Sequence, residues 1–105
     1  MSEVSEVKIA YIAKAGTSSG VVDLGDYYPY LHVVIPTIDS ATLKVQVSEL
    51  IDGTYQDLGP AVTAAASTGA YSDTWTLGGW RYIKIVAGAA QNTGEVKIKV
   101  RGWRG

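Results

Sequence analysis

Short runs of alternating apolar and polar residues recur along this chain, and they constrain its fold more than any other feature. In the clearest run, Thr42–Leu50, the side chains of Leu43, Val45 and Val47 fall on one face and polar side chains fall on the other. Alternation with a period of two is typical of a half-buried β-strand. No stretch has a sustained apolar stripe of helical period, so the sequence predicts an all-β protein.

Further strand-like runs follow one another with turn signals roughly every ten residues. They cover Val7–Ala13, Val21–Gly25, Leu31–Pro36, Thr54–Gly59, Ser72–Gly78, Trp80–Gly88 and Glu95–Trp103. Asp52–Gly53 predicts a hairpin turn, and the alanine-rich segment 60–70 predicts a loop or a strand of small residues. The nearly continuous apolar run Leu31–Pro36 predicts a central strand that is buried on both faces. Together the runs predict one domain, residues 1–105, folded as an antiparallel, jelly-roll-like β-sandwich of about eight strands.

Composition excludes several functional classes. Nine basic and ten acidic residues give a net charge of −1, which does not favour a nucleic-acid partner. The absence of cysteine excludes disulfides and thiolate chemistry. No apolar run has the length of a membrane span, and the N-terminal segment does not have the pattern of a signal peptide. We therefore expect a soluble protein that is made in the cytoplasm.

The sequence offers no obvious catalytic or metal-binding cluster. Its one histidine, His32, lies within an apolar run, where we expect a structural role. The aspartates lie in or near predicted turns, where aspartate commonly caps the backbone: Asp23, Asp26, Asp39, Asp52, Asp57 and Asp73. We therefore expect a protein that is not an enzyme and that needs no metal or cofactor.

The last predicted strand has a basic outer face. Lys97, Lys99, Arg101 and Trp103 share one side by the period of two. If this strand neighbours Trp80–Gly88, the outward Tyr82 would extend the face into a basic stripe with aromatic flanks. Such a stripe fits docking to an acidic partner or a sugar, or an ordinary solvated face whose lysines prevent edge aggregation. Trp103 must either fold back onto the domain or be covered by a partner.

Other aromatic residues are candidates for contact. Tyr27, Tyr28 and Tyr30 surround Pro29, and they could stack on sugars, bury in a neighbouring subunit or plug the end of the sandwich. In the segment "WRYIKI", Ile83 and Ile85 are expected in the core, and Trp80 and Tyr82 are candidates for an outward contact. Arg81 would then need a carboxylate, a carbonyl group or the end of the sheet as its partner.

Several segments resemble small β-sandwich proteins of bacteriophage virions: "VVDLGDYYPYLHVVIPTIDSATLKVQVSEL", "DGTYQDL" and "LGGWRYIKIVAG", across about residues 21 to 103. This resemblance implies a structural role in a phage particle, as a capsid decoration or cement protein or as a small tail or fibre component. The segment "WRYIKI" also resembles a core strand of discoidin-like jelly rolls, which bind carbohydrate.

We therefore expect a virion protein that stabilises the shell by binding across subunit junctions as a homo-oligomer. Its expected partner is the major capsid protein or another virion protein. The alternative is a carbohydrate-binding module with a saccharide ligand. The residues expected to make these contacts are Tyr27, Tyr28, Tyr30, Trp80, Tyr82, Lys97, Lys99, Arg101 and Trp103.

Overall fold

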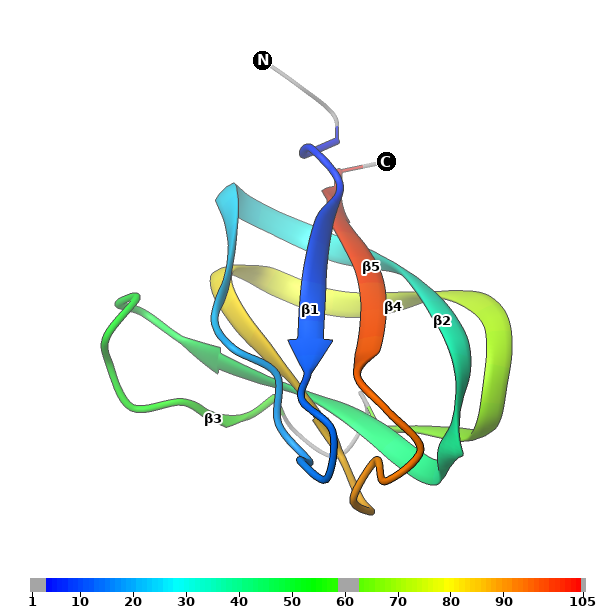
Figure 1. Cartoon of the computed structure of the whole chain (residues 1–105). Coiled ribbons are helices and arrows are strands. Elements are labelled where there is room, and N and C mark those ends of the chain that lie inside the picture. The colour runs from blue at the N-terminus through cyan, green and yellow to red at the C-terminus, as the bar shows by residue number, and fades with distance from the viewer. Residues whose placement is uncertain (1–3, 59–62, 105) are drawn as a thin grey trace.

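The structure is a computed structural model that describes residues 4–58 and 63–104, and every regular element within them is a β-strand. The all-β prediction is therefore confirmed (Figure 1). The elements are β1 (Lys8–Ile12), β2 (Val22–Ser48), β3 (Gln56–Asp57), β4 (Thr63–Ala87) and β5 (Val96–Trp103).

All the strands pair in antiparallel fashion, in the order β1-β5-β2-β3, with β4 also paired to β2. The sheet closes on itself because the last part of β4 pairs with both ends of β2. Ile83 is opposite Val22 near the start of β2 and opposite Val47 near its end. The middle of β2 instead pairs with β5 on one side and with residues 71–76 of β4 on the other. The sheet is therefore curled into two facing layers (Figure 1).

The predicted boundaries differ from the structure because β2 and β4 are long strands that bend without ending. The sequence predicts separate strands at Val21–Gly25, Leu31–Pro36 and Thr42–Leu50, whereas β2 runs through all three as one element of 27 residues. The pairing with β4 shifts register between Asp23 and Tyr30 and again after Thr37. Such irregularities bend a strand while keeping most of its ladder.

Gly78 and Gly79 allow a comparable bend in β4. Their φ angles of 79° and 95° lie in the left-handed region that glycine adopts without strain. A Cβ atom at either position would meet nothing within 4 Å. Glycine is therefore favoured at these positions by the backbone conformation and not by a lack of space for a side chain. The sequence predicts a strand break at this point, and the structure has a bend within β4.

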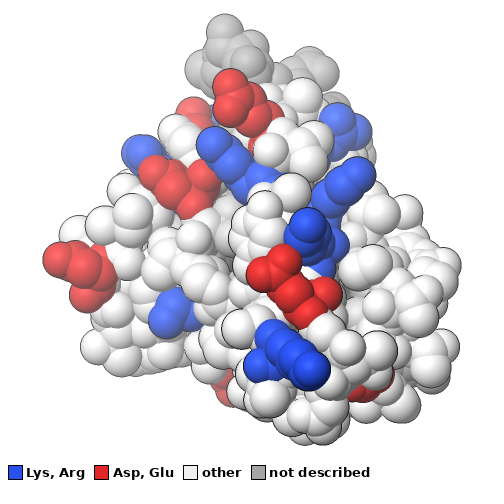
Figure 2. Space-filling view, viewed as in Figure 1, with Lys and Arg blue, Asp and Glu red and all other residues white. Residues whose placement is uncertain are grey.

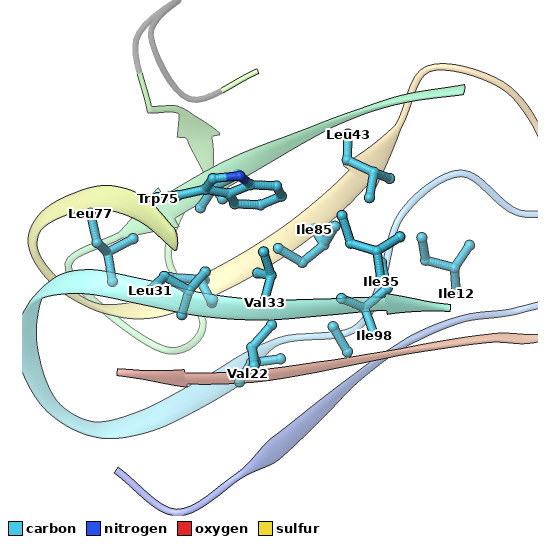
Figure 3. Close-up of a cluster of buried hydrophobic side chains, with 14 of the residues drawn as sticks. Ile12, Val22, Leu31, Val33, Ile35, Leu43, Trp75, Leu77, Ile85 and Ile98 are labelled. Carbon is cyan, nitrogen blue, oxygen red and sulfur yellow. The ribbon is translucent and has the colours of Figure 1, made fainter. Parts of the chain in front are cut away.

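The core fills the space between the two layers (Figure 3). Leu31, Val33 and Ile35 project inward from the middle of β2, Ile85 projects from the opposite layer, and Ile83 on the same strand as Ile85 is also buried. Their side chains are at most 1 % exposed. β5 follows its predicted alternation, because Val96, Ile98 and Val100 are buried and the residues between them are exposed.

One prediction about the core is wrong. The Leu31–Pro36 segment is not buried on both faces, because the Val34 side chain is 49 % exposed and His32 is partly exposed. The inner face of this segment meets the core, and its outer face has no further layer of described residues over it. This segment therefore contributes to the surface of the molecule as well as to its core.

Gln91 joins β2 to the β1–β2 and β4–β5 loops at one end of the sandwich, and it is only 1 % exposed. Its amide Oε1 accepts from the backbone N–H of Asp39 at 2.8 Å, and its Nε2 donates to the carbonyls of Asp39 and Ala89 at 3.1 Å each. Its own backbone N–H donates to the carbonyl of Gly16 at 3.0 Å. A buried amide that is fully paired in this way fixes the positions of the loops around it.

The Asp39 carboxylate completes this junction. The hydroxyl of Thr93 donates to it, as do the backbone N–H groups of Thr93 at 3.0 Å and Asn92 at 2.6 Å. The Thr93 hydroxyl, followed by these backbone groups, lowers the pKa of Asp39. Asp39 therefore caps backbone N–H groups, as predicted, and its carboxylate links β2 to the β4–β5 loop.

Replacing Gln91 by alanine should destabilise the fold. The change leaves the backbone groups of Asp39 and Ala89 without their buried partner, which costs about 1 to 3 kcal/mol. Urea unfolding measures this loss, and Asn92→Ala is the matched control because the Asn92 side chain is exposed. The control should stay within about 0.5 kcal/mol of the original chain. Equal stability of the two variants would contradict the role assigned to Gln91.

Candidate functional site

The outer face of the layer that contains β1, β5 and the middle of β2 is basic. Lys97, Lys99 and Arg101 are exposed along β5, as the alternation predicts. Viewed as in Figure 1, the molecule carries several Lys and Arg side chains on this side, with some Asp and Glu side chains among them (Figure 2). The register places Tyr11 opposite Lys97 and Val34 opposite Lys99, so apolar side chains lie beside the basic ones.

Trp103 folds back onto this same face. It is opposite Tyr30 in the β2–β5 register, and the two ring centroids are 5.4 Å apart. Its ring also lies 4.8 Å from the ring of His32. Arg101 Nε donates to His32 Nδ1 at 3.3 Å, so the basic and aromatic groups are in direct contact. Of the two arrangements that the sequence leaves open for Trp103, the structure has the one in which it packs on its own domain.

The chain next to Trp103 is held in place by Tyr28 and Ser5. A Cβ atom at Gly102 would lie 2.2 Å from the Tyr28 ring, so only glycine fits beneath that ring. Gly102 also exchanges hydrogen bonds with Ser5 at 2.8 and 2.9 Å. The guanidinium of Arg104 lies 4.5 Å from the centre of the Tyr28 ring and pairs with Asp26 at 2.7 Å.

These contacts correct the prediction for Tyr28. Its side chain is only 4 % exposed, so it fills the end of the sandwich and is not available as an outward contact. Tyr30 and Tyr27 remain at the surface, with 38 % and 54 % of their side chains exposed. The three tyrosines therefore do not act as one group, because the bend in β2 turns Tyr28 inward.

A groove runs along the middle of β2 on the basic face, with a volume of about 420 Å³. β5 supplies one wall and β4 supplies the other. The side chains that give the groove its character are those of Val7, His32, Val34, Ser72, Thr74, Lys99 and Arg101. One wall is therefore cationic, the other carries two hydroxyl groups and the Asp73 carboxylate, and the floor combines an imidazole ring with a half-exposed valine.

The groove retains a positive charge that the fold does not neutralise. Among residues 4–58 and 63–104, neither Lys99 nor Arg101 forms an ion pair with a carboxylate. Asp73 also lines the groove, and its carboxylate accepts from the indole N–H of Trp75 at 3.1 Å and from the backbone N–H of Thr74 at 2.8 Å, so the groove has two cations against one carboxylate. The free cations on β5 therefore suit an acidic ligand surface.

The other predicted aromatic contacts do not join this face. β5 pairs with β1 and β2, whereas residues 82–87 of β4 pair with the two ends of β2 in the opposite layer. The single stripe that would combine β5 with Tyr82 is therefore not formed. Trp80 packs partly against the core, and Tyr82 is partly exposed beside the guanidinium of Arg81.

Arg81 has the carboxylate partner that its position calls for. Its Nε and Nη2 atoms donate to the two oxygens of Asp23 at 2.7 and 3.2 Å. This hydrogen-bonded pairing is the main cause that lowers the pKa of Asp23, and the backbone N–H of Gly25 adds to it. The pair joins the start of β2 to β4, so it stabilises the closure of the sheet.

Removing the Arg81 guanidinium should therefore raise the pKa of Asp23. In the original chain the pKa of Asp23 is lowered from its ordinary value of 3.8. The ion pair therefore stabilises the fold fully at pH values above 3.8, and this stabilisation is lost as the pH falls through the lowered pKa of the folded state. We expect Arg81→Gln to move the Asp23 titration to higher pH in carboxyl NMR, and the unfolding free energies of the two chains to converge in acid. Lys84→Gln, on the same strand, is the control. An unchanged Asp23 titration in Arg81→Gln would contradict the assignment.

The described residues contain no group of three or more His, Cys, Asp or Glu side chains that could hold a metal ion. Within the same part of the chain, no helix has the length and apolar character needed to cross a membrane. The arrangement supports binding chemistry, through cations, stacked rings and a shallow groove.

No protein-family model matches the chain, and no curated protein matches it. Its fold is similar to that of several solved structures. The SPBc2 prophage-derived protein YomS aligns over 97 % of this chain and 96 % of its own, with a TM-score of 0.57 and 15 % identity. CBM32-1 from a family 31 glycoside hydrolase of Clostridium perfringens aligns over 94 % of both chains, with a TM-score of 0.59 and 14 % identity.

A second module from Clostridium perfringens, CpGH89CBM32-6, aligns over 100 % of this chain and 96 % of its own, with a TM-score of 0.52 and 14 % identity. At these identities the likeness concerns the fold alone. It supports a sandwich-type arrangement of the curled sheet, and it covers nearly the whole length of the chain and of these proteins.

Sequence reasoning missed two members of the basic face, His32 and Val34. The signal was present, because Tyr30, His32 and Val34 alternate along one strand. It was hidden by the apolar character of the run, which predicts burial on both faces. Only the pairing of β2 with β5 reveals that these side chains lie beside Lys99 and Arg101.

Proposed function

We propose that the chain is a non-enzymatic structural protein of a bacteriophage particle, of the kind that decorates or cements the shell. The observation that carries the proposal is the basic and aromatic face of β5 and β2, where Lys99 and Arg101 have no carboxylate partner among the described residues and Val34 is half-exposed. Such a face docks onto an acidic protein surface that the particle repeats. Further support comes from the full-length fold likeness to a prophage-derived protein.

The physical advantage of such a role is repetition. A shallow face with a few cations and apolar side chains gives a weak contact for one copy, especially at high salt. Many copies held by the symmetry of a particle convert weak contacts into a large total stabilisation. A docking protein of this kind needs a rigid sheet face and no catalytic group.

Charge reversal on the face should remove the chain from the particle. In purified particles of the phage whose genome encodes it, we expect quantitative mass spectrometry to find the chain in a simple ratio to the major shell subunit. Lys97→Glu, Lys99→Glu and Arg101→Glu together should lower the copies retained by about tenfold or more. Lys14→Glu is the control, because Lys14 is exposed in a turn after β1.

Two results would count against the proposal. Complete absence of the original chain from the particles would exclude a structural role there. Full retention of the triple variant would mean that another surface makes the contact. A few copies per particle, still lost on charge reversal, would place the same docking face in a tail or fibre and would exclude a decoration role.

A second candidate function, binding of a neutral saccharide, is favoured by a different region. Trp80 lines two hollows of about 390 and 440 Å³, and Glu49 lines both of them. Exposed Tyr27 borders the second hollow. An aromatic ring beside a carboxylate can stack on a sugar and accept from its hydroxyl groups. The fold likeness to carbohydrate-binding modules is compatible with this function.

NMR titration with neutral hexoses tests the saccharide function. Binding should shift the indole signal of Trp80, and Trp80→Ala should abolish the response. Trp103→Ala is the control and should leave the response intact, because Trp103 lies on β5 beside Tyr30, outside both hollows. Absence of any shift at millimolar sugar, or equal shifts in both variants, would rule out this site.

A further inference from the structure

The hairpin loop between β2 and β3 carries an exposed apolar pair between two acids. Leu50 and Ile51 are 64 % and 52 % exposed, and Glu49 and Asp52 are exposed on either side of them. Within the described part of the chain, neither acid forms an ion pair. Exposed apolar side chains of this size at the tip of a loop are typical of a contact surface. We call residues 49–52 the acidic loop.

Hydrogen bonds hold the backbone of the acidic loop in one conformation. The Ser48 hydroxyl donates to the carbonyl of Leu50 at 2.7 Å, and the backbone N–H of Gly53 donates to that same carbonyl at 3.0 Å. The Tyr55 hydroxyl donates to the carbonyl of Ile51 at 2.8 Å. Since the loop is already ordered, docking it costs less conformational entropy than docking a free segment would.

The acidic loop and the groove on β2 have complementary chemistry. The groove offers Lys99 and Arg101 on its wall, neither of which forms an ion pair within residues 4–58 and 63–104, and half-exposed Val34 on its floor. The loop offers two carboxylates that flank two apolar side chains. Opposite charges around an apolar centre are the arrangement that gives protein contacts their orientation and specificity.

The loop of one molecule cannot reach the groove of the same molecule. In Figure 1 the loop between β2 and β3 projects at the left, away from β5, whose outer face borders the groove. From this separation and the complementary chemistry, we infer that the groove binds the acidic loop of a second copy of the chain. The inference rests on the proposed docking role of the basic face, and it names the partner of that face.

Contact between two different surfaces of one chain is head-to-tail, so a pair of copies keeps one free groove on one copy and one free loop on the other. Such contacts continue from copy to copy and produce a ring or a filament, depending on whether the rotation between copies closes. On a particle, this would link neighbouring copies around the shell.

Sedimentation velocity over a concentration series tests the inference with two double variants. The groove variant is Lys99→Glu with Arg101→Glu, and the loop variant is Leu50→Ser with Ile51→Ser. The original chain should self-associate, more weakly at high salt, and each variant should associate at least about tenfold more weakly. Lys14→Glu is the matched control and should associate like the original chain. Circular dichroism establishes that both variants remain folded, which we expect because all four side chains are exposed.

An equimolar mixture of the two variants gives the sharpest result. The intact groove of the loop variant can bind the intact loop of the groove variant. The opposite pairing cannot form, because it would join the altered groove of the groove variant to the altered loop of the loop variant. We therefore expect a heterodimer and no larger species. Larger assemblies in the mixture, or a mixture that stays monomeric, would overturn the head-to-tail arrangement.

The same variants separate this inference from the proposed function. If the original chain stays monomeric at all concentrations, the inference is overturned. If the groove variant is then lost from particles while the loop variant is retained, the docking face stands and its partner is another protein. If both variants are retained on particles as well, the proposed function of the face fails too.

Discussion

The whole structure depends on one segment of β4 that pairs with both ends of β2. Residues 82–87 pair with Leu43–Ser48 on one side, and residues 82–83 also pair with Val22–Asp23 on the other, so the sheet cannot lie flat and must curl into two layers. The curl buries the inward alternation of β2, β4 and β5 in one core. It also decides which surface is left over, since the outer face of β1, β5 and the middle of β2 has no described element above it. The candidate docking face is therefore a consequence of how the sheet closes.

Local alternation was enough to predict much of this. The period of two in Glu95–Trp103 gave the correct buried and exposed sets on β5, because each strand residue alternates whatever its neighbours are. It could not give the neighbours themselves. Placing Tyr82 beside β5 required knowledge of long-range pairing, which one sequence does not contain. The sequence predicted that Arg81 needs a polar or charged partner, but it could not identify Asp23 as that partner, because this also requires knowledge of long-range pairing.

The other differences also arise from the bends. The sequence contains the turn residues, such as Gly78 and Gly79, but a turn residue can end a strand or bend it. In β2 and β4 it bends the strand, so segments that look separate in the sequence form continuous ladders. Tyr28 shows the effect on single residues. Its inward position depends on Gly102, a residue far along the chain that leaves room for its ring. The jelly-roll arrangement and the count of about eight strands remain predictions.

The distribution of charge gives the chain a polarity that its net charge of −1 conceals. Asp23, Asp26 and Asp57 are each paired with a cation of the same chain, which offsets the charge of these three acids. Among the described residues, the charges without an ion pair include the two cations of the groove, Lys99 and Arg101, and the two carboxylates of the acidic loop. A molecule of this kind has little net attraction or repulsion for its copies at long range. Its association therefore depends on how the groove of one copy and the loop of another are oriented when they meet. A rigid sheet face and an ordered loop favour such an orientation-dependent contact.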